Sequence, residues 1–161
     1  MTTAAFAVPR QERYFEDYVP GSIYEFGTLT VTEPEIIEFA KQFDPQLMHI
    51  DPEWARSHGR YGGIIASGWH TVGLAMRLFV DHYMSEVASL ASPGVDEVRW
   101  PNPVRPGDQL RLRLTILDAR PSRTKPDRGI IRTHFELLNQ SDQIVLSLVG
   151  MSIVGRRPSE F

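Results

Sequence analysis

Residues 67–90 read SGWHTVGLAMRLFVDHYMSEVASL, and this segment dictates the architecture expected for the whole chain. Its apolar side chains recur with the spacing of one face of an α-helix. The expected buried stripe consists of Val72, Met76, Phe79, Tyr83 and Val87, and the expected outward stripe of Arg77, Asp81, Ser85 and Ser89. We therefore predict one helix of roughly 35 Å over this segment, with its first turns buried.

The chain after this helix has the pattern of β-strands. Ser92-Pro93-Gly94 is expected to end the helix, because proline and glycine both disfavour its continuation. Apolar and charged residues then alternate, as Leu110 and Arg111 do, which is typical of half-buried strands. The last strand is apolar on both faces, so we expect it in the interior of the sheet. The four predicted strands cover residues 95–104, 109–119, 130–139 and 144–154.

The chain before the long helix predicts one strand and two shorter helices. The capping box of Thr32 and Glu35 is expected to begin a helix, which must end before Pro45. Asp51 followed by Pro52 has the pattern of a second, brief helix start. The other expected elements are a strand at residues 23–31 and a loop at residues 44–51.

This order of elements predicts an α+β fold class in a single domain over residues 1–161, with residues 1–15 irregular. We expect an antiparallel sheet of about five strands wrapped around the long central helix. Such a sheet covers its helix on one side and leaves free edge strands. We therefore expect a homodimer, formed by edge pairing or by packing of helix faces, or a higher homo-oligomer of such dimers.

Composition excludes several classes of protein. The 161 residues carry 17 Lys and Arg against 20 Asp and Glu, a net charge of −3, so no nucleic-acid partner is expected. The chain contains no Cys, which excludes disulfides and thiolate chemistry. The longest uncharged run, at residues 61–76, is shorter than a membrane span, and no secretory signal is visible. We therefore expect a cytoplasmic protein without a membrane partner.

Asp44 and His49 form the first candidate site. One lies at a helix end and the other in the following turn, so their side chains can converge. A carboxylate beside an imidazole can hold a water molecule and move protons near neutral pH. The alternatives are a helix-end carboxylate that bonds its own backbone and a buried, structural histidine.

Gly68 is the second candidate, because it opens the long helix. Backbone N–H groups at a helix start have no partner in the helix, and glycine lets a ligand carbonyl approach them. The result would be an oxyanion hole, and the alternative is close packing of the helix start. His49, Asp51, His58 and His70 match no standard ligand set, so no metal is expected.

Three motifs together resemble the MaoC-like dehydratase family of hot-dog folds, which includes the (R)-specific enoyl-CoA hydratases. Residues 44–51 read DPQLMHID, similar to the family's Asp-x-Asn-Pro-x-His-x-Asp. Residues 64–68 read IIASG and resemble the glycine-ended segment that opens the family's central helix. The third motif is VRW at residues 98–100 followed by PVRPGD at 103–108. The similarity in order and spacing extends over about residues 15–155.

The resemblance implies a hydratase or dehydratase. Asp44 and His49 would activate a water that adds to the double bond of a trans-2-enoyl thioester, and the Gly68 N–H would stabilise the enolate-like oxygen. Gln46, Ala66 and Ser67 are expected to contact the substrate. An acyl-CoA thioester would be the substrate, with CoA as its carrier and no separate cofactor.

The sequence also departs from the family pattern. Phe43, Gln46, Leu47 and Ser67 stand where the family has Gly, Asn, Pro and His, so the acyl group and the orientation of the polar contacts remain open. A hot-dog acyl-CoA thioesterase and a non-catalytic acyl-thioester-binding subunit are the two alternatives on the same fold. Product analysis separates them, because a hydratase keeps the thioester and a thioesterase releases free thiol.

Overall fold

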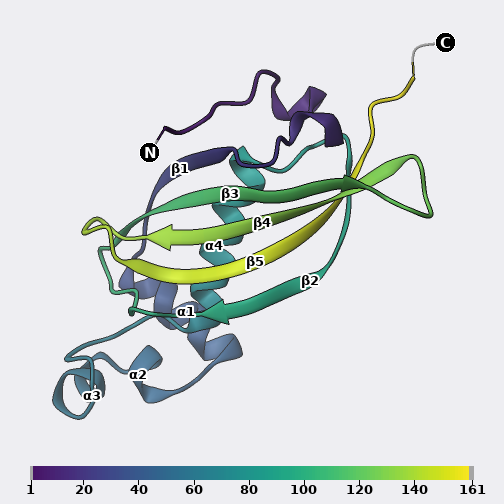
Figure 1. Ribbon diagram of the computed structural model, residues 1–161. Coiled ribbons are helices and arrows are strands. Elements are labelled where there is room, and N and C mark those ends of the chain that lie inside the picture. The colour runs from purple at the N-terminus through teal and green to yellow at the C-terminus, as the bar shows by residue number, and fades with distance from the viewer. Residues whose placement is uncertain (1, 160–161) are drawn as a thin grey trace.

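The computed structural model describes residues 2–159 and shows a five-stranded antiparallel sheet curved around one central helix, α4 (Figure 1). The strand order is β1-β3-β4-β5-β2. The strands are β1 Ile23–Thr30, β2 Ser89–Arg99, β3 Gln109–Pro121, β4 Arg128–Leu138 and β5 Ile144–Gly155. The helices are α1 Glu33–Phe43, α2 Leu47–Ile50, α3 Pro52–Ser57 and α4 Gly68–His82, with 3-10 turns at Arg10–Glu12 and Phe15–Asp17. The expected α+β architecture is confirmed.

The core lies between α4 and the inner face of β3, β4 and β5. Burial alternates strictly along most of these strands, so every second side chain faces the helix. The helix contributes Ala75, Leu78 and Phe79, and the ring of Phe79 lies 4.8 Å from that of Phe135. As expected, β5 lies inside the sheet, between β4 and β2.

The predicted helix starts in the first half of the chain are confirmed. Thr32 and Glu35 form a reciprocal capping box, and α1 ends at Phe43, just before Asp44-Pro45. Asp51 Oδ1 accepts the Trp54 N–H at 2.9 Å and caps α3. The loop expected at residues 44–51 differs in one respect, because residues 47–50 form the short helix α2. This turn carries His49 inward, where its side chain is buried.

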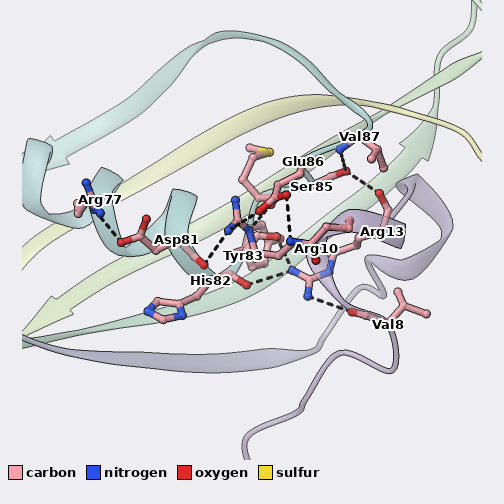
Figure 2. Close-up of polar contacts among 12 residues, drawn as sticks. Val8, Arg10, Arg13, Arg77, Asp81, His82, Tyr83, Ser85, Glu86 and Val87 are labelled. Atoms are coloured by element: carbon pink, nitrogen blue, oxygen red, sulfur yellow. Dashed lines mark hydrogen bonds and ion pairs between the residues drawn. The ribbon is translucent and has the colours of Figure 1, made fainter.

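The predicted length of the central helix was wrong. Helix α4 ends at His82, and β2 begins at Ser89 and runs through Pro93-Gly94, the predicted break. The physical cause lies in the N-terminal segment, whose Arg10 and Arg13 donate to carbonyls of residues 81–84, at the end of the helix and just after it (Figure 2). Residues 83–88 therefore turn away from the helix axis and lead into strand β2.

The two predicted stripes of this helix need the same correction. Ser85, expected outside, is buried, and its hydroxyl donates to Arg13 O at 2.6 Å and accepts from Ala88 N–H. Met76 and Val87, expected inside, are exposed. Trp69, Met76 and Val80 are exposed large apolar residues of α4, so residues 2–159 leave an apolar face of this helix uncovered.

The two edges of the sheet differ. Residues near the N-terminus cover β1, where Ala4 N–H donates to Ile23 O at 2.6 Å. By contrast, β2 is exposed at nine of its eleven positions, on both faces of the sheet. None of the helices in residues 2–159 is long and apolar enough to cross a membrane.

Candidate active site

The predicted site residues come from three segments that meet at the start of α4. Asp44 directly follows α1, and its N–H closes that helix by donating to Ala40 O at 2.8 Å. His49 lies in α2, which follows immediately. Ser67 is the N-cap of α4 and Gly68 its first residue. Pro45 stops α1 from continuing, so the chain turns and brings His49 back towards Asp44.

Asp44 and His49 face each other across a short gap. The distance from His49 Nε2 to Asp44 Oδ2 is 3.4 Å, longer than a good hydrogen bond between such groups. On its other side, His49 Nδ1 lies 2.7 Å from Ile65 O. A carbonyl oxygen can only accept, so Nδ1 carries the proton and Nε2 of the neutral ring presents a lone pair towards Asp44. Both acceptors border the cavity described below, so a water molecule lying there beside the pair can donate to both.

Two side chains hold the Asp44 carboxylate in place. Gln46 Nε2 donates to Oδ1 at 2.7 Å, and Ser67 Oγ donates to Oδ2 at 2.7 Å. Partial burial raises the pKa of Asp44, but these two hydrogen bonds, together with the positive charge that the His49 ring carries when it is protonated, outweigh it and leave that pKa below its ordinary value. The carboxylate is therefore ionised at neutral pH.

The Gly68 N–H at the start of α4 is the candidate donor to a ligand. Ser67 Oγ accepts the Trp69 N–H at 3.3 Å, and Ser67 O accepts the Thr71 N–H at 3.0 Å. The Gly68 N–H precedes the first intrahelical bonds, and the residue borders the cavity described below. A carbonyl oxygen entering that cavity can accept from Gly68 at the positive end of the helix dipole.

These groups line a cavity of about 330 Å³. Its polar groups are gathered at Asp44, Gln46 and His49, and most other walls are apolar or aromatic. Such a mixture is typical of a small-molecule site. The other lining residues are Met48, Tyr61, Ile65, Ala66, Gly68, Trp69, Thr71, Trp100, Pro101, Asn102, Pro103 and Val104.

The structure brings all six predicted site residues together. Five of them border the cavity, and one lies behind its wall. Asp44, Gln46, His49, Ala66 and Gly68 border the cavity. Ser67 lies behind Asp44, and its hydroxyl bonds that carboxylate and the backbone of α4. Ala66 N–H is occupied by Val104 O at 2.9 Å.

Sequence reasoning missed two contributors to the site. The Ile65 carbonyl sets the tautomer of His49, and no side-chain pattern can reveal a backbone acceptor. Trp100 covers Gly68 although it lies 32 positions further along the chain. The VRW motif was visible as part of the resemblance, but its approach to Gly68 is a tertiary contact.

The remaining histidines lie apart from one another. Among residues 2–159, no group of three or more His, Asp or Glu side chains is placed to hold a metal ion. His58 Nδ1 lies 2.8 Å from Ser57 Oγ. His70 is buried and stacks on Phe39, with ring centroids 4.8 Å apart.

Comparisons with known proteins agree with this geometry. The family described as MaoC like domain matches residues 17–134. The uncharacterized protein YdeM of Bacillus subtilis is 32% identical over 127 residues, which cover 79% of this chain and 88% of that protein. The crystal structure of a MaoC-like dehydratase from Rhodospirillum rubrum has a TM-score of 0.81 at 38% identity and covers 91% of this chain and 99% of its own.

More distant structures share the architecture. The unliganded R-hydratase PhaJ1 of Pseudomonas aeruginosa has a TM-score of 0.70 at 19% identity, with 92% of each chain covered. A likeness at this identity concerns the fold. The hot-dog fold expected from the resemblance is confirmed by such structural neighbours.

Proposed function

The chain belongs to the MaoC-like domain family, and we propose that it adds water reversibly to the double bond of a trans-2-enoyl thioester, giving a 3-hydroxyacyl thioester. CoA is the proposed carrier and enters as part of the substrate. The observation that carries this proposal is the 3.4 Å gap between His49 Nε2 and Asp44 Oδ2, which opens on the same cavity as Gly68. The name of the Rhodospirillum rubrum relative, a MaoC-like dehydratase, supports the same class of reaction.

The first step concerns the water. A water in the cavity beside these two groups donates one hydrogen to the Asp44 carboxylate and the other to His49 Nε2. As its oxygen bonds to C3 of the enoyl group, one O–H bond breaks and the proton moves to Nε2. The Asp44 carboxylate and the Ile65 carbonyl stabilise the positive charge on the ring. General base catalysis of this kind contributes roughly 10²–10⁴-fold to the rate.

The second step concerns the thioester. The electrons of the C2–C3 double bond move to the thioester oxygen as an enolate, which accepts a hydrogen bond from the Gly68 N–H. One such donor contributes about 10²–10³-fold. The imidazolium then returns a proton to C2, so the net change is addition of one water. Dehydration follows the same steps in reverse, without electron transfer to a cofactor.

The test is the absorbance of a short trans-2-enoyl-CoA incubated with the protein, with a thiol reagent in a parallel sample. We expect loss of the conjugated enoyl signal without release of free thiol. Asp44→Asn and His49→Ala should each lose at least about 100-fold in kcat. The control is His58→Ala, because His58 is exposed and absent from the cavity wall.

Each alternative has its own outcome. Release of free thiol would identify a thioesterase. Tight binding of acyl-CoA with no turnover, unchanged in Asp44→Asn, would identify a non-catalytic binding subunit. Equal activity of wild type and both site variants would contradict the assignment of Asp44 and His49.

We also infer that a second copy of this chain covers the outer face of α4 and β2. Trp69, Met76 and Val80 are large apolar residues exposed on α4, and Leu90 and Val95 are exposed on β2. A group of exposed large apolar side chains such as these is typical of a protein–protein interface. Trp69 and Trp100 also border the cavity, so a homodimer would close the site from solvent.

A further inference from the structure

Trp100, directly after β2, lies on Gly68. The indole Nε1–H donates to Gly68 O at 2.9 Å. A Cβ atom built on Gly68 would lie 2.6 Å from Cε2 of the indole and 2.9 Å from Cδ2, closer than real Cβ atoms approach. The three nearest atoms all belong to this ring, so Trp100 is what requires glycine at this position.

The segment that carries Trp100 is fixed at two points to the start of α4. The first is the indole hydrogen bond to Gly68, and the second is Ala66 N–H to Val104 O at 2.9 Å. Pro101 and Pro103 lie between these anchors and restrict the backbone. The Trp69 ring adds a T-shaped contact with the indole, with ring centroids 5.5 Å apart. Residues 100–104 therefore brace the segment 66–68.

Trp100 is not a core residue. It is 42% exposed and forms part of the cavity wall. A large aromatic side chain that is anchored but left accessible serves a site more readily than it serves global stability. Its anchor is Gly68, which borders the same cavity.

We propose that Trp100 is a positioning residue that holds the Gly68 N–H where the thioester oxygen becomes negative. This role rests on the proposed hydration reaction. The charge on that oxygen develops as water adds, so the position of the donor matters more in the transition state than in the bound substrate. Loss of the brace should therefore lower kcat and leave substrate affinity nearly unchanged.

The experiment compares Trp100→Phe with Trp54→Phe in the full chain. Trp54 lies on α3, stacks with His58 and is absent from the cavity wall, so its variant is the matched control. Phenylalanine keeps an aromatic ring at residue 100 but removes the Nε1–H donor. We expect Trp100→Phe to lower kcat about tenfold, with KM and the calorimetric affinity for a saturated acyl-CoA within about threefold. The control should match wild type, and neither variant should shift Tm by more than a few degrees.

A second pair of variants tests the contact itself. Gly68→Ala should lower kcat by about 100-fold because the new methyl group displaces the indole. In a Trp100→Ala background this obstacle is gone, so adding Gly68→Ala should cost no further activity. Double-mutant cycles report such coupling directly.

The possible results distinguish the positioning role of Trp100 from the proposed hydration reaction. Wild-type protein that leaves every enoyl thioester unchanged would overturn the proposed reaction and this role with it. An active wild type with an unchanged kcat in Trp100→Phe, or with a change confined to KM, would overturn the positioning role alone. Additive losses in Trp100→Ala and Gly68→Ala would do the same.

Discussion

At the scale of single residues, the site depends on how Asp44 is held. Gln46 and Ser67 each donate to one carboxylate oxygen, and His49 lies 3.4 Å from Oδ2. These contacts leave the pKa of Asp44 below its ordinary value despite the opposing effect of burial. Both oxygens are thus directed before substrate arrives, which is the preorganisation that a water-activating site requires.

The lowered pKa of Asp44 predicts a pH-dependent contribution to stability. The unfolded chain binds a proton at Asp44 more readily than the folded chain does, so this contribution is present above the ordinary pKa and is lost as pH falls through the folded value. Urea unfolding between about pH 6 and pH 3 should show a steeper loss in wild type than in Asp44→Asn. Parallel curves would contradict the lowered pKa.

Ser67 connects the carboxylate to the helix. It is buried, donates to Asp44 and accepts the Trp69 N–H as the N-cap of α4. Ser67→Ala should lower the free energy of unfolding by about 1 kcal/mol and lower kcat by about tenfold. Ser57→Ala is the matched control, because the exposed Ser57 hydroxyl bonds only locally, to Glu53 O and His58. An unchanged kcat in Ser67→Ala would show that Gln46 alone suffices to orient Asp44.

The candidate site could be predicted where its residues lie close together in the sequence. Asp44 and His49 are five positions apart, and Gly68 follows its own N-cap, so short motifs were enough to find them. Trp100 meets Gly68 only because β2 runs back along the sheet, and the Ile65 carbonyl carries no side-chain signal. Contacts between distant segments are set by tertiary packing, which one sequence does not display.

At the scale of elements, α4 ends where residues 10–18 of the N-terminal segment contact it. Its side chains continue with helical spacing beyond His82, which is why a longer helix was predicted. Arg10 and Arg13 instead donate to carbonyls of residues 81–84, at and just after the helix end (Figure 2). Tyr18 OH also donates to Tyr83 O at 3.0 Å. A helix end capped by groups about 70 positions away leaves no local stop signal.

This arrangement predicts that Arg13 is a stability residue. It is buried, donates to the carbonyls of Val8, His82 and Tyr83, and its guanidinium lies 3.5 Å from the ring centroid of Phe6. Arg13→Ala leaves the partly buried carbonyls of Val8 and His82 without this donor and removes the guanidinium from the Phe6 ring, so the free energy of unfolding should fall by about 3 kcal/mol. kcat at a permissive temperature should stay near the wild-type value.

Arg77→Ala is the control for this experiment. Arg77 lies on the same helix and pairs with Asp81 at 2.7 Å on the exposed surface (Figure 2). Such pairs contribute only about 0.3–0.5 kcal/mol. Similar unfolding free energies for the Arg13 and Arg77 variants in urea titrations would show that the N-terminal segment does not hold α4.

At the scale of the whole molecule, the sheet leaves one side of its helix uncovered. The N-terminal segment covers the β1 edge and the C-terminal end of α4, but β2 is exposed on both faces. Pro93 and irregular pairing along β2 limit regular extension of the sheet from this edge. Of the two routes to a dimer that the sequence suggested, packing through the apolar face of α4 is thus the better supported.

The inferred dimer makes Met76 a sensitive position. Its side chain is 47% exposed in the isolated chain, so Met76→Glu should leave the fold intact, whereas the same change inside an interface buries an unpaired charge. Leu117→Glu is the matched control, because Leu117 is 46% exposed on β3, outside the proposed interface. Light scattering after size exclusion should give a dimer mass for wild type and Leu117→Glu, and a monomer mass for Met76→Glu. Because the second copy is expected to close the cavity at Trp69 and Trp100, monomeric Met76→Glu should also lose hydratase activity; a fully active monomer would show that one chain forms a complete site.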